Sequence, residues 1–112
     1  MATAAEVRNT LLQVVEILRK GWCRRSLART AKGACTDVHS STAVKFCPEG
    51  AIMKACAKNI PLLHEVKRTL DSHIGMPARE WNDWHVKNKQ ECIRTIKILA
   101  DSLVETGIAT GR

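Results

Sequence analysis

The chain has 112 residues, a length that suits one domain with a genuine hydrophobic core. Its 18 Lys and Arg against 11 Asp and Glu leave a formal charge of +7, which favours an encounter with nucleic acid, an anionic membrane or an acidic protein without choosing among them. Three Trp, one Phe and no Tyr disfavour the stacking platforms of single-strand nucleic-acid binders, and no apolar run is long enough to span a bilayer.

The first predicted element is a helix that begins at the capping box "TAAE" of residues 3–6. Gly21 suits the residue after its end, because glycine adopts positive φ without penalty. Trp22 would then fold back toward Ile17. The apolar residues of this helix recur at helical spacing: Val7, Leu11, Val14, Val15 and Leu18.

The next stretch is less regular. Residues 23–36 predict a long irregular loop, and "CTDVHS" at 35–40 could be a short extended piece. A second helix is predicted from "HSSTAVKFC" at 39–47. Pro48 would either kink that helix or open a new one, and we favour a kink or short break at Cys47. The second helix would be capped by one of three hydroxyl residues: Ser40, Ser41 or Thr42.

Helical signals are clear in the C-terminal half. A third helix is expected over residues 61–73, capped by Asn59 and ended by Gly75. A short segment follows at 77–84, and a capping box at 88–91 opens the last long helix. We therefore predict an all-α protein.

The predicted fold is one compact domain over residues 1–112, with about four principal helices and one long irregular loop after the first helix. The ends are expected to fray near residues 1–3 and 107–112. No linker or internal repeat indicates a second domain.

Three segments carry a family resemblance: "GWCRRSLAR" at 21–29, "AVKFCPEGAI" at 43–52 and "WND" at 81–83. Together they resemble small, uncharacterised bacterial and phage proteins, a domain of unknown function with Gly-Trp-Cys, Phe/Trp-Cys-x-x-Gly-Ala and Trp-Asn-Asp segments. The resemblance covers most of the chain and implies a helical fold but no reaction. The chain departs from the pattern after "WND", where Lys87 and Asn88 stand at the positions of Arg and Thr.

The resemblance directs attention to eight residues: Trp22, Cys23, Phe46, Cys47, Gly50, Trp81, Asn82 and Asp83. Structural roles are expected for four of them: Trp22, Phe46, Gly50 and Trp81. Asn and Asp favour turns and caps, so Asp83 is more readily explained by structure than by recognition.

A cysteine-dependent enzyme is one possible function. The nucleophile would be Cys23 or Cys47, with Asn82 or Asp83 to orient a histidine base. The arginines that follow Cys23 would lower the pKa of its thiol. The alternative is that both cysteines simply pack beside the tryptophans. Three histidines could serve as the base: His39, His64 and His85.

A zinc site is a weaker possibility. Its ligands would be Cys35, His39 and Cys47, with Cys23 or Cys56 as the fourth. Only "CTDVH" has the close spacing that such sites use, so a polar loop is the simpler interpretation. We expect free thiols in the cytoplasm and no cofactor.

The favoured function is binding. No acid lies between Glu16 and Asp37, and this stretch could contact phosphate or carboxylate through bidentate arginines. Trp84 and His85 offer a second candidate surface. No recognition helix is visible, so nucleic-acid binding would be nonspecific. The cations of the basic loop are Arg24, Arg25, Arg29 and Lys32.

We therefore predict a small non-enzymatic binding or regulatory accessory protein. It would dock on an acidic protein surface or a nucleic-acid backbone, and not on a membrane. The cysteine-dependent enzyme stays the alternative.

Overall fold

The computed structural model describes the backbone of residues 2–110 and the side chains of residues 2–103. The fold is mostly helical, as predicted. Over the described residues it has five helices where about four were expected, and one small two-stranded sheet, so it is not strictly all-α. None of the helices in the described part has both the length and the apolar character needed to cross a membrane. The elements in chain order are α1 (Ala4–Lys20), β1 (Ala28–Arg29), β2 (Lys45–Phe46), α2 (Pro48–Cys56), α3 (Ile60–Ile74), α4 (Ala78–Trp84) and α5 (Lys89–Thr110).

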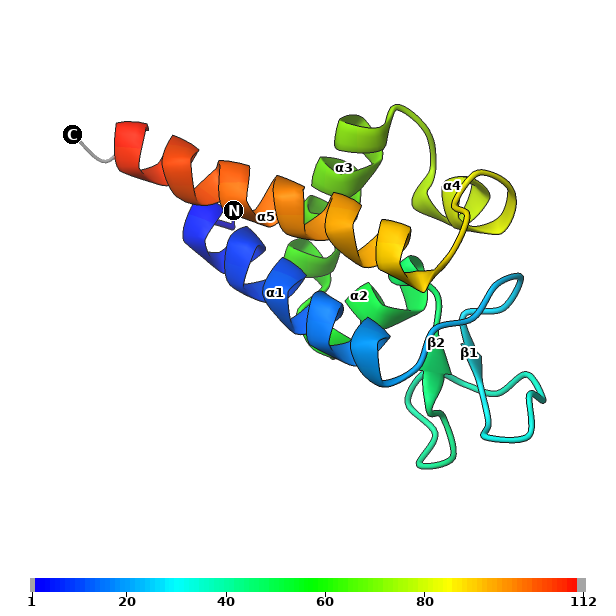
Figure 1. The fold of residues 1–112 in the computed structure, drawn as a ribbon. Coiled ribbons are helices and arrows are strands. Elements are labelled where there is room, and N and C mark those ends of the chain that lie inside the picture. The colour runs from blue at the N-terminus through cyan, green and yellow to red at the C-terminus, as the bar shows by residue number, and fades with distance from the viewer. Residues whose placement is uncertain (1, 111–112) are drawn as a thin grey trace.

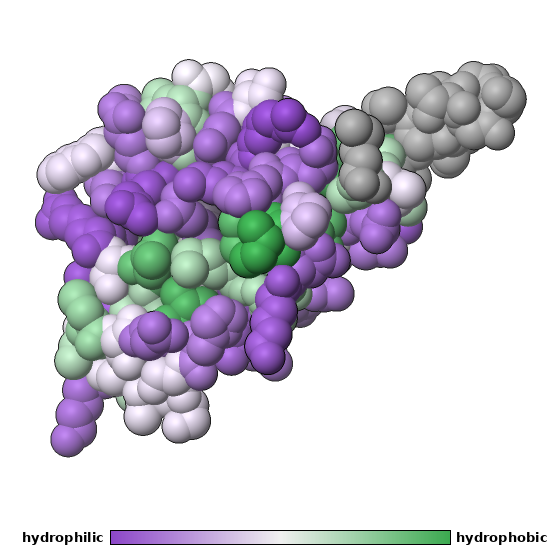
Figure 2. Space-filling model, turned by 180° about the vertical axis from the view of Figure 1, so that it is seen from behind, coloured by the Kyte–Doolittle hydropathy of each residue, from purple (hydrophilic) through white to green (hydrophobic). Residues whose placement is uncertain are grey.

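The core lies where α1 packs along α5 and also contacts α2 and α3. Figure 1 shows α1 and α5 side by side and antiparallel, with the two strands at the end where α1 finishes. Seen from behind, the surface is largely hydrophilic, with apolar side chains gathered near its middle (Figure 2). The largest fully buried apolar side chains come from four helices: Leu11, Leu18, Ile52, Leu70 and Ile96.

The helix starts follow from local capping. The α1 box is confirmed, since Glu6 N donates to Thr3 Oγ1 at 3.1 Å and Thr3 N donates to Glu6 Oε1 at 2.9 Å. Asn59 caps α3 by accepting from Leu62 N at 3.2 Å. Gly75 ends α3 in the left-handed region at φ 79°. These three signals were therefore correctly predicted.

The last helix begins slightly differently from the prediction. Asn88 Oδ1 accepts from Glu91 N at 2.9 Å, as expected, but the Glu91 carboxylate accepts from Lys87 N instead of Asn88 N. The helix extends past Gly107 to Thr110. The expected fraying falls in part on residue 1 and residues 111–112, which lie outside the described residues.

The end of α1 differs from the prediction. Gly21 has φ −173° and ψ 126°, so it is extended and does not adopt the positive φ that was predicted for it. Glycine is needed there for close approach, because a Cβ would lie 2.0 Å from Val44 O. Trp22 forms a parallel bridge with Phe46 in place of the expected fold-back.

The helix predicted over 39–47 was also wrong. Residues 39–42 form a turn, and β2 pairs antiparallel with β1, with Ala28 opposite Phe46. Pro48 therefore opens α2, and Cys47 is its N-cap, not a kink. Within the segment 35–40, Cys35 makes an isolated bridge with Arg29.

Candidate functional site

The three segments of the resemblance meet at one end of the molecule. Together with residues 84–86, which follow the third segment, they form what we call the motif corner (residues 21–29, 43–52 and 81–86). Backbone hydrogen bonds join the first two segments; among them, Phe46 N donates to Gly21 O at 3.0 Å, and Cys23 N donates to Phe46 O at 3.1 Å. Cys47 N also donates to Leu27 O at 3.3 Å. The backbones of the first two segments are therefore hydrogen-bonded directly to each other.

Asn82 joins the third segment to the first. Its side chain is fully buried, its Oδ1 accepts from Trp22 Nε1 at 2.8 Å, and its Nδ2 donates to Cys23 O at 3.0 Å. Asp83 Oδ1 accepts from Arg25 N at 2.8 Å. Buried amides need such partners, so these bonds give Asn82 a structural role.

Glycine is required at position 50 by close approach. A Cβ there would lie 1.9 Å from Leu27 O, on the first segment. Phe46 and Trp81 are both buried in the same core cluster. All three residues therefore lie in the packed interior at this end of the molecule.

The four cations of the basic loop divide into two groups. The Arg24 guanidinium donates to Val86 O and lies 4.9 Å from the centre of the Trp22 ring. The Arg29 guanidinium donates to Gly33 O at 2.8 Å and to Arg24 O at 3.1 Å. Both side chains therefore stabilise the loop through bonds to backbone carbonyl groups.

Arg25 and Lys32 remain exposed. The Arg25 backbone is in the left-handed region at φ 63°, and its guanidinium lies 4.8 Å from the centre of the Trp84 ring. Trp84 is 67% exposed, and the exposed His85 follows it. Left-handed backbone in an arginine costs free energy, and the hydrogen bond from Arg25 N to Asp83 Oδ1 helps to offset that cost.

Neither candidate nucleophile has an activated environment. Burial raises the pKa of the Cys23 thiol, against an opposing effect of Arg29, and burial raises the pKa of Cys47 to about 11. The pKa of Cys23 is thus not lowered as expected from the arginines that follow it. Within residues 2–103, Cys23 Sγ donates to Ser26 O, Cys47 Sγ accepts from Gly50 N, and no histidine bonds to either.

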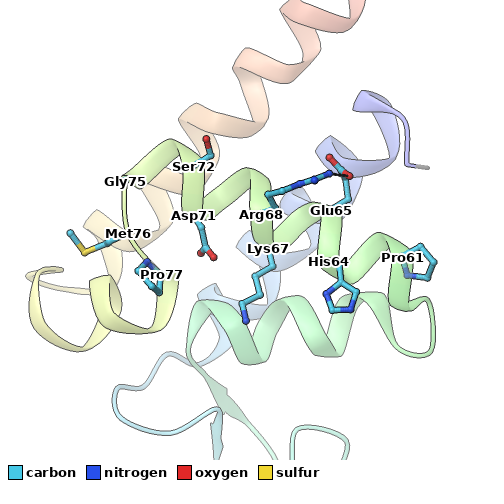
Figure 3. Close-up of a pocket in the computed structure, with 10 residues that line it drawn as sticks. All are labelled: Pro61, His64, Glu65, Lys67, Arg68, Asp71, Ser72, Gly75, Met76 and Pro77. Carbon is cyan, nitrogen blue, oxygen red and sulfur yellow. Dashed lines mark hydrogen bonds and ion pairs between the residues drawn. The ribbon is translucent and has the colours of Figure 1, made fainter.

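The histidines lie on the surface. His39 is in the turn before β2, and His85 follows α4. His64 lines a hollow of about 760 Å³ along α3, where Figure 3 shows Lys67 and Asp71 on the same side of the helix. No cysteine lines this hollow, so it does not assemble the pair that thiol catalysis requires.

The structure does not assemble the possible zinc site either. Within the described residues, no three His, Cys, Asp or Glu side chains are grouped so as to hold a metal ion. Cys47 is 1% exposed and caps α2, whereas Cys35 and His39 are exposed.

Glu49 is a residue that the sequence interpretation missed. It is only 9% exposed, and its carboxylate pairs with Arg79 at 2.7 Å and with Lys67 at 3.2 Å. The sequence contained a signal for its burial, since Glu49 is the one acid within the apolar stretch "FCPEGAI". Glu49 thus links α2 to α3 through Lys67 and to α4 through Arg79.

Comparison with known proteins identifies a family. The sequence pattern of DUF6197, a family of unknown function, matches residues 2–102, a range that contains all three segments of the motif corner. No curated protein and no solved structure matches the chain. The chain therefore belongs to DUF6197, a family of unknown function.

Proposed function

We propose that this protein is a non-enzymatic binding or regulatory accessory protein that docks on an acidic partner through Arg25 and Trp84. The observation that supports this proposal is the Arg25 guanidinium stacked 4.8 Å from the centre of the exposed Trp84 ring. Stacking limits the rotamers of the arginine before a partner arrives, so less entropy is lost on binding. Arginine and tryptophan are also the residues most enriched among binding hot spots.

Of the cations in the basic loop, the proposal assigns binding only to those that are exposed. Arg24 and Arg29 bind backbone carbonyl groups, which leaves Arg25, Lys32 and the neighbouring His85 on the surface. The partner is an acidic protein surface or, nonspecifically, a nucleic-acid backbone. Both present oxygen atoms that a guanidinium can bind in pairs.

The setting of this binding is also part of the proposal. Five free thiols suit a reducing compartment, so we place the protein in the cytoplasm. The motif segments resemble those of bacterial and phage proteins, and we infer such an origin from them. Cysteine catalysis is not favoured, because both candidate thiols are buried. Among the described side chains, no histidine is hydrogen-bonded to either of them.

Fluorescence anisotropy with two labelled probes, a poly-glutamate peptide and a short DNA duplex, tests the proposal. Arg25→Ala and Trp84→Ala should each weaken binding about tenfold, or ~1.4 kcal/mol. The matched controls Lys58→Ala and Ile60→Ala, both exposed and outside the motif corner, should not. Equal affinity in all four variants contradicts the proposal.

The salt dependence separates the two partner classes. Binding to the duplex should fall steeply as salt rises, because each neutralised phosphate releases counterions. A flat salt response excludes phosphate contacts as the source of that affinity.

A further inference from the structure

A second surface lies between the end of α1 and the first half of α5. It is a groove of about 470 Å³, which we call the α1–α5 groove, and Figure 1 shows the two helix ends side by side. Four cations and two isoleucines contribute to its lining: Arg19, Lys89, Arg94, Lys97, Ile93 and Ile98. The groove thus combines apolar contact area with positive charge.

The spacing on α5 explains this combination. Lys89, Ile93 and Lys97 are four residues apart, so they form one ridge of the helix, and Arg94 and Ile98 lie on the adjacent ridge. Ile98 is 55% exposed. Covering this isoleucine would stabilise a complex by about 25 cal/mol for each Å² of apolar surface removed from water.

The cations of the groove are weakly engaged within the chain. Arg19 pairs with Glu16 at 3.6 Å and Lys97 pairs with Asp101 at 3.0 Å, and both acids are more than half exposed. Such surface pairs contribute roughly 0–1 kcal/mol, so a partner carboxylate can replace them. Arg94 is exposed and has no ion-pair partner among the described side chains.

The fourth cation, Lys89, lies at the end of the groove where α5 begins. Lys89 Nζ donates to Arg19 O, so the ammonium lies at the carbonyl end of α1. Cations are favoured at a helix C-terminus by its partial negative charge. Lys89 therefore connects the two helices and leaves Arg94 as the cation most available to a partner.

We infer that the α1–α5 groove binds an acidic amphipathic segment of a partner protein. Its apolar side chains would cover Ile93 and Ile98, and its carboxylates would meet Arg94 and Lys97. This inference rests on the proposed function for the acidic character of the partner, and it selects a protein over nucleic acid. A sugar-phosphate backbone would satisfy the cations but leave Ile98 without an apolar partner.

The test uses a labelled synthetic peptide in which Leu and Glu recur at helical spacing. A second peptide with every Leu replaced by Ser keeps the charge, and a DNA duplex keeps only the phosphate. Arg94→Glu should weaken binding of the Leu–Glu peptide at least about tenfold, and Ile98→Ala about threefold. The Ser peptide and the duplex should not respond to Ile98→Ala.

Two controls match these variants. Lys58→Glu makes the same charge reversal at an exposed site between α2 and α3, and Ile60→Ala removes an isoleucine that is 52% exposed, close to the 55% of Ile98. Circular dichroism checks that all four variants keep the helical content. The controls should bind as the unmodified protein does.

The outcomes separate the inference from the proposed function. Absence of binding of the Leu–Glu peptide at about 1 mM, or equal binding of the Ser peptide, overturns the groove inference. In one outcome, Arg25→Ala and Trp84→Ala weaken the binding of the acidic probes, whereas Arg94→Glu and Ile98→Ala leave that binding unchanged. The groove inference then fails and the proposed function stands. If only the groove variants weaken binding, the groove stands and the role of the Arg25–Trp84 pair fails.

Discussion

The indole Nε1 of Trp22 donates a hydrogen bond of 2.8 Å to Oδ1 of Asn82, sixty positions further along the chain. The same amide donates to Cys23 O at 3.0 Å, so both of its ends are used. One fully buried side chain thus fastens α4 to the loop after α1. Such contacts are costly to break, because a buried polar group that loses its partner is not compensated by water.

Asn82→Asp should destabilise the fold by about 2–4 kcal/mol. The carboxylate keeps an acceptor for Trp22 Nε1 but cannot donate to Cys23 O, and it brings a charge into a buried site. Urea unfolding followed by tryptophan fluorescence measures the change. Asn59→Asp is the control, since Asn59 is an exposed N-cap where either residue accepts equally well. Equal stability of the two variants would contradict this role of Asn82.

Gly50→Ala should destabilise the protein by about 2 kcal/mol or more, because the new Cβ would lie 1.9 Å from Leu27 O and the backbone would have to move. Gly33→Ala is the control. It has positive φ but nothing within 4 Å of the added atom, so it should cost about 1 kcal/mol. Thermal unfolding by circular dichroism ranks the two. The interpretation fails if Gly33→Ala proves the more harmful substitution.

Thiol labelling under native conditions should modify Cys35 first, since it is exposed and the other four cysteines are buried. The buried thiols should react only as the fold opens locally. Mass spectrometry after a short exposure to iodoacetamide gives the order, and urea-unfolded protein is the control in which all five react. Faster labelling of Cys23 than of Cys35 would restore the case for a catalytic thiol.

Stability should fall at alkaline pH. Burial raises the pKa of Cys47 from 9.0 to about 11 and that of Cys92 to about 12, so the unfolded chain loses these protons first. Above pH 9 the unfolded state therefore binds fewer protons than the folded state, and the free energy of unfolding decreases as pH rises toward 11 and 12. Urea midpoints at pH 8 and at pH 10 measure this decrease.

Cys47→Ser supplies the control for the pH effect. A serine at the N-cap can accept from Gly50 N as the thiol does, but it does not titrate in this range. The variant should lose less stability between the two pH values than the unmodified protein. An equal loss would show that Cys47 is not responsible.

The predictions that succeeded depended on neighbouring residues. The box of Thr3 and Glu6, the Asn59 cap and the glycine end at Gly75 each use partners within one helical turn. The helix predicted over 39–47 was wrong because the two-residue strand in this segment forms by pairing with distant residues, Ala28 and Arg29. No local pattern in that segment contains this information.

The sequence indicated which residues belong to the candidate site, but not which of them contact one another. Asn82 and Trp22 were both singled out, yet the bond between them depends on how α4 packs against the loop. The basic loop was correctly located, but the sequence cannot distinguish Arg24, which binds Val86 O, from Arg25, which stacks on Trp84. Adjacent arginines differ here only through their tertiary neighbours.

The antiparallel pair of Ala28 and Phe46 holds together the two ends of the segment 30–44. Because these ends are already close, lengthening the segment adds little entropic cost, about 0.6 kcal/mol for each doubling of its length. The turn at 39–42 lies outside the motif corner and takes no part in the hydrogen bonds that Asn82 makes to Trp22 and Cys23. It is therefore a suitable place to insert a peptide tag or a reporter domain while the motif corner stays intact.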